Sequence, residues 1–172
     1  MKNKLKMVGF SADWNTTDRV LTLTDVSLQG VLKTRIIEFN DYNQISKETR
    51  DNNIITYEYD ENHKLTRAIK SNHGRTTCIV TYTYENDCIV KTYRYDRRTH
   101  IQKADLNMNI IFESISYSDG SESIDKYQYN DNECVISNET IHKNKGIILH
   151  HSISYYDDTG KLIKTDDISI KE

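Results

Sequence analysis

Apolar and polar residues alternate along most of the chain in short stretches that end in an aromatic residue, a pattern typical of β-strands. A polar turn with Asp or Asn follows each stretch, and an aliphatic residue comes next. From Tyr57 the chain runs Tyr-Glu-Tyr-Asp-Glu-Asn-His-Lys-Leu, ending at Leu65. Because Tyr57 and Tyr59 are two residues apart, they point to one face of a strand. The chain then reverses at Asp60–His63 and Leu65 begins the return strand, which predicts a hairpin.

This unit recurs, and recurrence of this kind indicates a repeat architecture. The copies begin at Ile37, Tyr57, Tyr82, Tyr93, Tyr127 and Tyr155. The aliphatic residues that open their return strands are Ile45, Leu65, Ile89, Ile101, Val135 and Leu162. A degenerate copy covers residues 115–120. We therefore predict an all-β fold, an antiparallel meander of repeated Tyr-rich hairpins. It forms either a single extended or curled sheet, or an open barrel or sandwich.

Outside the repeats, which cover residues 35–166, the pattern is less regular. Residues 18–25 alternate and predict a strand that leads into the array, although Thr17-Asp18 also has the character of a helix start. Residues 166–170 predict a last edge strand. The chain has no proline and only six glycines, so it lacks the composition of a flexible linker. We expect one domain over residues 1–172.

The Tyr-rich hairpins resemble the YD repeats of the RHS family, whose pattern is Tyr-x-Tyr-Asp, a turn that often holds Gly, and then an aliphatic residue. The best matches are Tyr57-Glu-Tyr-Asp60, Tyr93-Arg-Tyr-Asp96 and Tyr156-Asp157. Most turns lack the glycine, and the chain is far shorter than the large shells of that family. The resemblance implies side-by-side antiparallel hairpins. It carries over no catalytic residue, since the repeats have none.

Composition indicates a thin sheet. Hydrophobic residues make up 36% of the chain, and the aromatic residues are 12 Tyr, 3 Phe and 1 Trp. Tyrosine covers a sheet with its ring while its hydroxyl stays hydrated. Three cysteines form an odd number, which favours reduced thiols. No apolar run follows the basic residues near Met1, so we expect no signal peptide, no membrane segment and a cytoplasmic location.

The sequence contains no standard catalytic motif. The adjacent His150 and His151 face opposite sides of a strand and cannot share one ion. Carboxylates such as Asp60-Glu61 and Asp157-Asp158 fall in turns, where solvent leaves both ionised. We therefore expect no enzyme, no metal site and no cofactor. The alternative of an enzyme would require shifted pKa values in a deep pocket.

Charge distribution points to a partner. The net charge of −3 gives no indication of a highly charged polymer as the partner, so nucleic acid is not expected. Residues 91–103 hold five bases and one acid, whereas residues 112–139 hold seven acids and one base. Both stretches are also consistent with solvated strand faces. The rows of tyrosine are consistent with cross-strand packing, or with an interface that binds a partner.

We expect a bacterial immunity protein that neutralises a toxin by direct binding, because the chain is small and its repeats resemble a class associated with polymorphic toxins. A carbohydrate-binding or shell-like YD-repeat module is the alternative. The predicted contact residues are Glu113, Asp119, Glu122, Asp125, Asp131, Glu133, Tyr127 and Tyr129.

Overall fold

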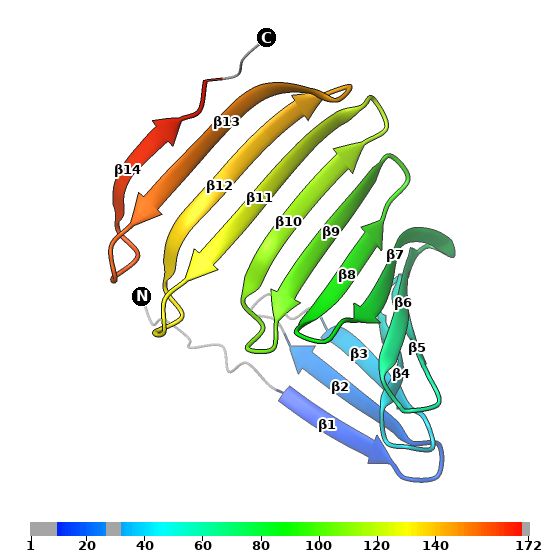
Figure 1. Ribbon diagram of the computed structural model, residues 1–172. Helices are drawn as coiled ribbons and strands as arrows, with labels where there is room; N and C mark the ends of the chain where they lie inside the picture. The colour runs from blue at the N-terminus through cyan, green and yellow to red at the C-terminus, as the bar shows by residue number, and fades with distance from the viewer. Residues whose placement is uncertain (1–9, 27–31, 170–172) are drawn as a thin grey trace, which may run out of the picture. The chain divides into compact units, whose positions relative to one another are not determined.

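The computed structural model describes residues 10–26 and 32–169, and none of these residues is helical. The strands pair antiparallel in chain order, from β1 to β14, as one meander sheet that is not closed into a barrel (Figure 1). The predicted all-β meander is thereby confirmed, in its single-sheet form. The described residues fall into two compact units, one up to Ile79 and the other from Val80 onward. The single domain stays a prediction.

The strands are short and joined by short connections. The first unit contains β1 (Phe10–Asn15), β2 (Val20–Val26), β3 (Leu32–Phe39), β4 (Ile45–Arg50), β5 (Asn53–Tyr59), β6 (Leu65–Asn72) and the start of β7 (Arg75–Tyr84). The second unit contains the rest of β7, β8 (Cys88–Arg94), β9 (Arg98–Asp105), β10 (Ile110–Tyr117), β11 (Ser121–Tyr129), β12 (Val135–Asn144), β13 (Ile147–Tyr156) and β14 (Leu162–Asp167).

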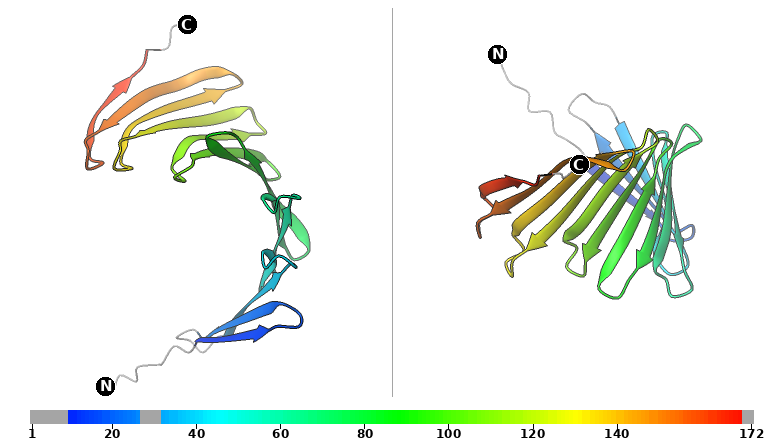
Figure 2. Two further views of the ribbon diagram at one scale, coloured as in Figure 1. Left: turned by 60° about the horizontal axis from the view of Figure 1, so that its bottom comes forward. Right: turned by 45° about the horizontal axis from the view of Figure 1, so that its top comes forward.

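The strands of each unit form a single layer (Figure 2), and the buried core is correspondingly small. The buried apolar side chains among the described residues are Ile37, Ala68, Cys78, Val80 and Ala104. Most other described strand residues are half-buried, and the buried polar residues among them are Ser114 and Ser152. This arrangement agrees with the low share of hydrophobic residues, because tyrosine rings and long polar side chains cover the sheet in place of a second layer.

A five-residue loop recurs at one end of the strands in each unit. In the loop after β5, Asp60 Oδ1 accepts hydrogen bonds from the backbone N–H groups of Asn62 and Lys64, at 2.9 and 2.8 Å. The backbone N–H of His63, which has φ of 63°, donates to Asp60 O. An Asx side chain bonds in this way because it reproduces a backbone turn. The same bonds form in the loops that begin at Asn40, Asp105, Asn130 and Asp157.

Four return strands begin at the predicted aliphatic residue, namely Ile45, Leu65, Val135 and Leu162. The predicted start at Ile89 is one residue late, and the start at Ile101 is wrong by three residues. Both hairpins close through shorter turns, in which Glu85 and Tyr95 donate to the carbonyl oxygens of Cys88 and Arg98. The loop at Asp105 was not predicted, because alanine precedes it in place of an aromatic residue.

The expectations for the ends of the chain are partly corrected. Residues 18–25 do contain a strand, β2, and the alternative of a helix start at Thr17-Asp18 is wrong. The predicted strand at residues 166–170 is wrong in its bounds, since β14 ends at Asp167. Pairing with β13 determines the bounds of β14, because the two strands form one hairpin in which β14 is the return strand. Ile170 and the basic residues near Met1 lie outside the described residues.

Candidate partner-binding surface

Two acidic side chains lie directly opposite each other in the second unit. Glu113 on β10 is the register partner of Asp125 on β11, so both project from the same face of the sheet. Tyr127 and Tyr129 follow Asp125 along β11 at intervals of two residues and share that face. We call these four residues the acidic face. The prediction that the two tyrosines lie on one face is confirmed.

The carboxylates of the acidic face have polar partners, and histidine is the one basic residue type among those that the described part of the chain provides. Glu113 Oε1 is hydrogen-bonded to His100 Nε2 and accepts from Gln102 Nε2 at 2.9 Å. Asp125 Oδ1 accepts from the Thr140 hydroxyl at 2.7 Å. Within the described parts of the chain, neither carboxylate forms an ion pair with lysine or arginine. Like charges directly opposite each other destabilise an antiparallel pair, so this arrangement costs folding free energy.

The Tyr127 side chain shows the negative field of this face. Burial raises the pKa of the Tyr127 hydroxyl to about 12, and the nearby carboxylates of Asp125 and Glu113 add to the shift. The register partner of Tyr127 on β12 is Asn138, whose Oδ1 is buried and has no hydrogen-bond partner within the described residues. A buried carbonyl oxygen without a donor costs folding free energy.

Tyr129 lies at the end of β11, where the acidic face meets the following loop. Its hydroxyl donates to Ile110 O at 2.8 Å, which fixes the ring across the start of β10. Asp131 and Glu133 follow in the exposed loop between β11 and β12. Glu133 has φ of 61°, and its backbone N–H donates to Asn130 O. The two loop carboxylates therefore lie beyond the same end of β11 as Tyr129.

The remaining two predicted contact residues lie elsewhere. Asp119 is in the turn at the opposite end of β11, where the Ser121 hydroxyl and backbone N–H both bind its carboxylate and lower its pKa. Glu122 projects from the other face, since it is separated from Asp125 by three residues along the strand. There it accepts a hydrogen bond from Ser116 and pairs with Lys143 at 3.4 Å. The predicted patch is thus divided among both faces and both ends of β11.

The other face of the same strands is charge-compensated. Lys126 Nζ lies 2.7 Å from Glu139 Oε2, and His151 Nε2 lies 2.8 Å from Glu139 Oε1. The hydrogen bond from Lys126, and then that from His151, lower the pKa of Glu139. Glu139 and Glu122 on this face each pair with a lysine, whereas among the described residues Glu113 pairs only with His100 and Asp125 with no basic side chain.

The comparisons with known proteins leave the chain without a family. No protein-family model matches it, and no curated protein is detectably similar to it.

Candidate chemistry is sparse in the described part of the chain. Residues 10–26 and 32–169 hold no group of three or more His, Cys, Asp or Glu side chains placed to bind a metal ion. No helix long and apolar enough to cross a membrane occurs among them. The three cysteines are unpaired thiols. A hydrogen bond to Glu85 raises the pKa of the Cys88 thiol, which makes it a poorer nucleophile.

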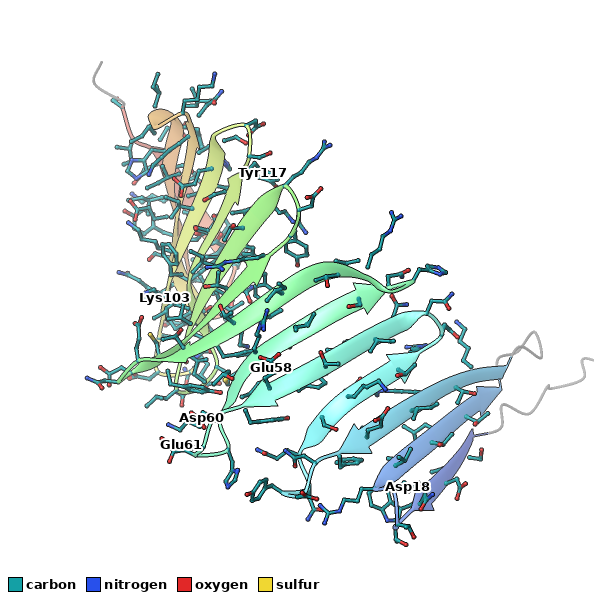
Figure 3. All side chains as sticks on the ribbon, turned by 90° about the vertical axis from the view of Figure 1, so that its right-hand side faces the viewer. Asp18, Glu58, Asp60, Glu61, Lys103 and Tyr117 are labelled. Atoms are coloured by element: carbon teal, nitrogen blue, oxygen red, sulfur yellow. The ribbon has the colours of Figure 1, made fainter. Side chains whose placement is uncertain are left out.

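An open pocket of about 470 Å³ lies in the first unit, beside the loops that follow β3 and β5. Tyr42 and His63 contribute rings whose centroids are 3.9 Å apart, and Gln44 Nε2 donates to His63 O at 2.7 Å. Figure 3 shows Asp60 and Glu61, which also line the pocket, in the loop at the end of β5. The pocket combines aromatic rings with amide and carboxylate groups.

Sequence reasoning missed the residues that support the acidic face. His100, Gln102 and Thr140 contact the two carboxylates, yet they lie far from them in sequence. Only the strand register brings them together, because Glu113 is opposite Gln102 and Asp125 is opposite Thr140. The lengths of the loops between strands give part of the information needed to predict this register. The bulge between Gln128 and Tyr129 also shifts it, and the alternation of apolar and polar residues in the sequence does not show that bulge.

Proposed function

We propose that the chain is a non-enzymatic protein-binding module whose acidic face binds a basic surface of a protein partner. The observation that carries the proposal is the directly opposed pair of Glu113 and Asp125, which has no lysine or arginine partner among the described residues. Such a pair destabilises the free sheet, and a bound cationic surface relieves the repulsion. Departures from local stability of this kind are typical of functional sites.

Tyrosine on the same face supports a protein partner. Tyr127 and Tyr129 are half-buried, and tyrosine is enriched in protein interfaces because its ring gives contact area at a low entropic cost. The hydrogen bond from Tyr129 to Ile110 O holds its ring in place before binding. Pre-organised side chains lose less conformational entropy in a complex.

The partner in this proposal is a toxin, and the chain is a cytoplasmic immunity protein of a bacterium. The resemblance of the hairpins to YD repeats, a class associated with polymorphic toxins, supports this choice. A toxin with a basic active cleft, such as a nuclease, has the charge that complements Glu113, Asp125 and the loop carboxylates of Asp131 and Glu133. Direct blockage of that cleft neutralises the toxin without chemistry.

A protection assay tests this function. Cells that express the candidate toxin of the adjacent gene are co-transformed with the wild-type chain or with the triple charge reversal at Asp125, Asp131 and Glu133. We expect the wild type to restore growth and the triple variant to fail. The Glu122→Gln variant, which removes a negative charge from the other face, should protect like the wild type. Equal protection by the triple variant and the wild type rejects the acidic face as the contact surface.

A carbohydrate-binding module is the second candidate, and the pocket beside Tyr42 and His63 favours it. Aromatic rings stack on sugar rings, while amide and carboxylate groups such as those of Gln44 and Glu61 bind hydroxyls. This candidate predicts retention on a glycan array that is lost in Tyr42→Ala and kept in the Glu113→Gln/Asp125→Asn variant. Absence of any retained glycan rejects it.

A further inference from the structure

Strand β14 is an edge of the sheet. It pairs with β13 on one side, and no other described strand pairs with its second side (Figure 1). The apolar residues Leu162 and Ile163 on β14 are 54% and 64% exposed, and Ile168 directly after it is 39% exposed. An edge with unpaired backbone groups and exposed apolar side chains is a template for another strand.

The backbone of β14 specifies which of its groups face outward. Ile168 N–H donates to His151 O at 2.8 Å, so this pair is hydrogen-bonded across the two strands. Hydrogen-bonded and non-hydrogen-bonded pairs alternate in an antiparallel ladder. Asp166 therefore directs its backbone groups at β13, whereas Thr165 and Asp167 direct their N–H and C=O groups at the free edge.

The charges of β14 complement themselves in one two-fold register. If Thr165 pairs with Thr165 of a second copy, Lys164 of each copy lies opposite Asp166 of the other. This register also places Thr165, with its outward backbone groups, at a hydrogen-bonded position, as the ladder requires. Lys164 and Asp166 share one face, where Lys164 Nζ lies 2.7 Å from Asp166 Oδ2 within the strand, and their side chains are 57% and 45% exposed.

Neighbouring registers lack this match. A two-fold centred at Asp167 places Asp166 opposite Ile168, and one centred at Ile163 places Lys164 opposite Leu162. Centres at Lys164 and Asp166 place like charges opposite each other. Among centres within β14, only the one at Thr165 pairs opposite charges between residues of the strand, and it also brings the exposed Leu162 opposite Ile168. Opposite charges directly across an antiparallel pair are stabilising, and charged edge strands select one register in this way.

We propose that the chain forms a two-fold dimer through antiparallel pairing of β14 with β14 of a second copy, centred on Thr165. The contact is isologous, so it closes after two subunits. It uses the sheet edge and leaves both faces of the second unit accessible. The dimer therefore does not depend on the acidic face.

Charge swapping between two copies tests this register by analytical ultracentrifugation of the full chain over a concentration series. In Lys164→Glu or Asp166→Lys alone, both cross-strand pairs become repulsive, and we expect the dimer Kd to rise about tenfold or more. An equimolar mixture of the two variants restores opposite charges across the interface and is expected to form a heterodimer. It does not restore the ion pair within either strand, so recovery reports the interface alone.

Two more variants complete the test. Thr165→Pro removes an outward N–H and the side-chain hydrogen bond to Ser154, but no backbone hydrogen bond to β13, so we expect a folded monomer by circular dichroism and sedimentation. The control Lys70→Glu changes an exposed lysine on β6 and should dimerise like the wild type. The proposal is overturned by a wild-type chain that stays monomeric, by open-ended assembly, by a dimer that survives Thr165→Pro, or by failure of the mixture to recover.

Discussion

Glu113 and Asp125 lie directly opposite each other on β10 and β11, and among the described residues neither carboxylate pairs with lysine or arginine, Glu113 having only His100 as a basic neighbour. Glu139 on the other face has both a lysine and a histidine within 2.8 Å. The same strands thus carry one compensated face and one strained face. This contrast locates the proposed binding surface more narrowly than the acidic stretch of sequence.

Neutralising the pair should stabilise the free protein. In Glu113→Gln/Asp125→Asn the amide oxygens still accept the hydrogen bonds from Gln102 and Thr140, while the repulsion disappears. We expect the free energy of unfolding in urea to rise by about 0.5–1 kcal/mol. Glu122→Gln, which loses an ion pair with Lys143, should not stabilise the protein. A destabilised double variant would contradict the strain assigned to this face.

The pKa of Tyr127 makes a prediction at alkaline pH. Its pKa of about 12 in the folded chain lies above the ordinary tyrosine pKa of 10.0, so the neutral hydroxyl is favoured in the folded chain. The resulting stability is present below pH 10 and is lost as the pH rises from there through about 12. Tyr127→Phe should show a shallower fall in stability over this range, together with the loss of one late tyrosinate step at 295 nm. An unchanged titration curve would argue against the burial of this hydroxyl.

Glu139 makes the opposite prediction at acidic pH. Its pKa is lowered by hydrogen bonds from Lys126 and His151, so its contribution is present above the unfolded pKa and is lost as the pH falls through the folded value. Glu139→Gln should lower the free energy of unfolding at pH 7 by about 0.5–1 kcal/mol. Below the pKa of Glu139 in the folded protein, the free energies of unfolding of the variant and the wild type should become equal. Chemical denaturation at a series of pH values measures both effects, and parallel curves would refute the assignment.

The recurring loop predicts which substitutions the hairpins tolerate. Asp60→Ala removes the acceptor for two backbone N–H groups and should cost about 1–2 kcal/mol of unfolding free energy. Asp60→Asn should stay within about 0.5 kcal/mol of the wild type, since asparagine takes the same position at Asn40 and Asn130. Glu61→Ala in the same loop is the control. A costly Asp60→Asn would show that charge, and not the Asx turn, stabilises the loop.

The sequence predicted the hairpins where loop chemistry determines them. Asp60 and Leu65 mark a turn and a return strand because the Asx side chain and the aliphatic residue have local roles. The start of β9 was predicted at Ile101 but lies at Arg98. The hairpin before it closes through a tight turn at Asp96-Arg97, which lacks the Asx loop on which the prediction relied.

The binding surface was harder to predict, because a run of acidic residues does not show which face each one takes. Asp125 and Glu122 are close in sequence and lie on opposite faces. Strand register, which depends on bulges such as the one at Gln128 and Tyr129, decides which distant residues support them.

Calorimetric titration of the chain with the toxin that it neutralises in the protection assay tests the central claim most directly. We expect Glu113→Gln/Asp125→Asn to raise the Kd by about tenfold or more, with a weaker salt dependence than the wild type, because the cationic contact is lost. Glu122→Gln should leave the Kd unchanged. Equal affinity of the double variant and the wild type would contradict the account.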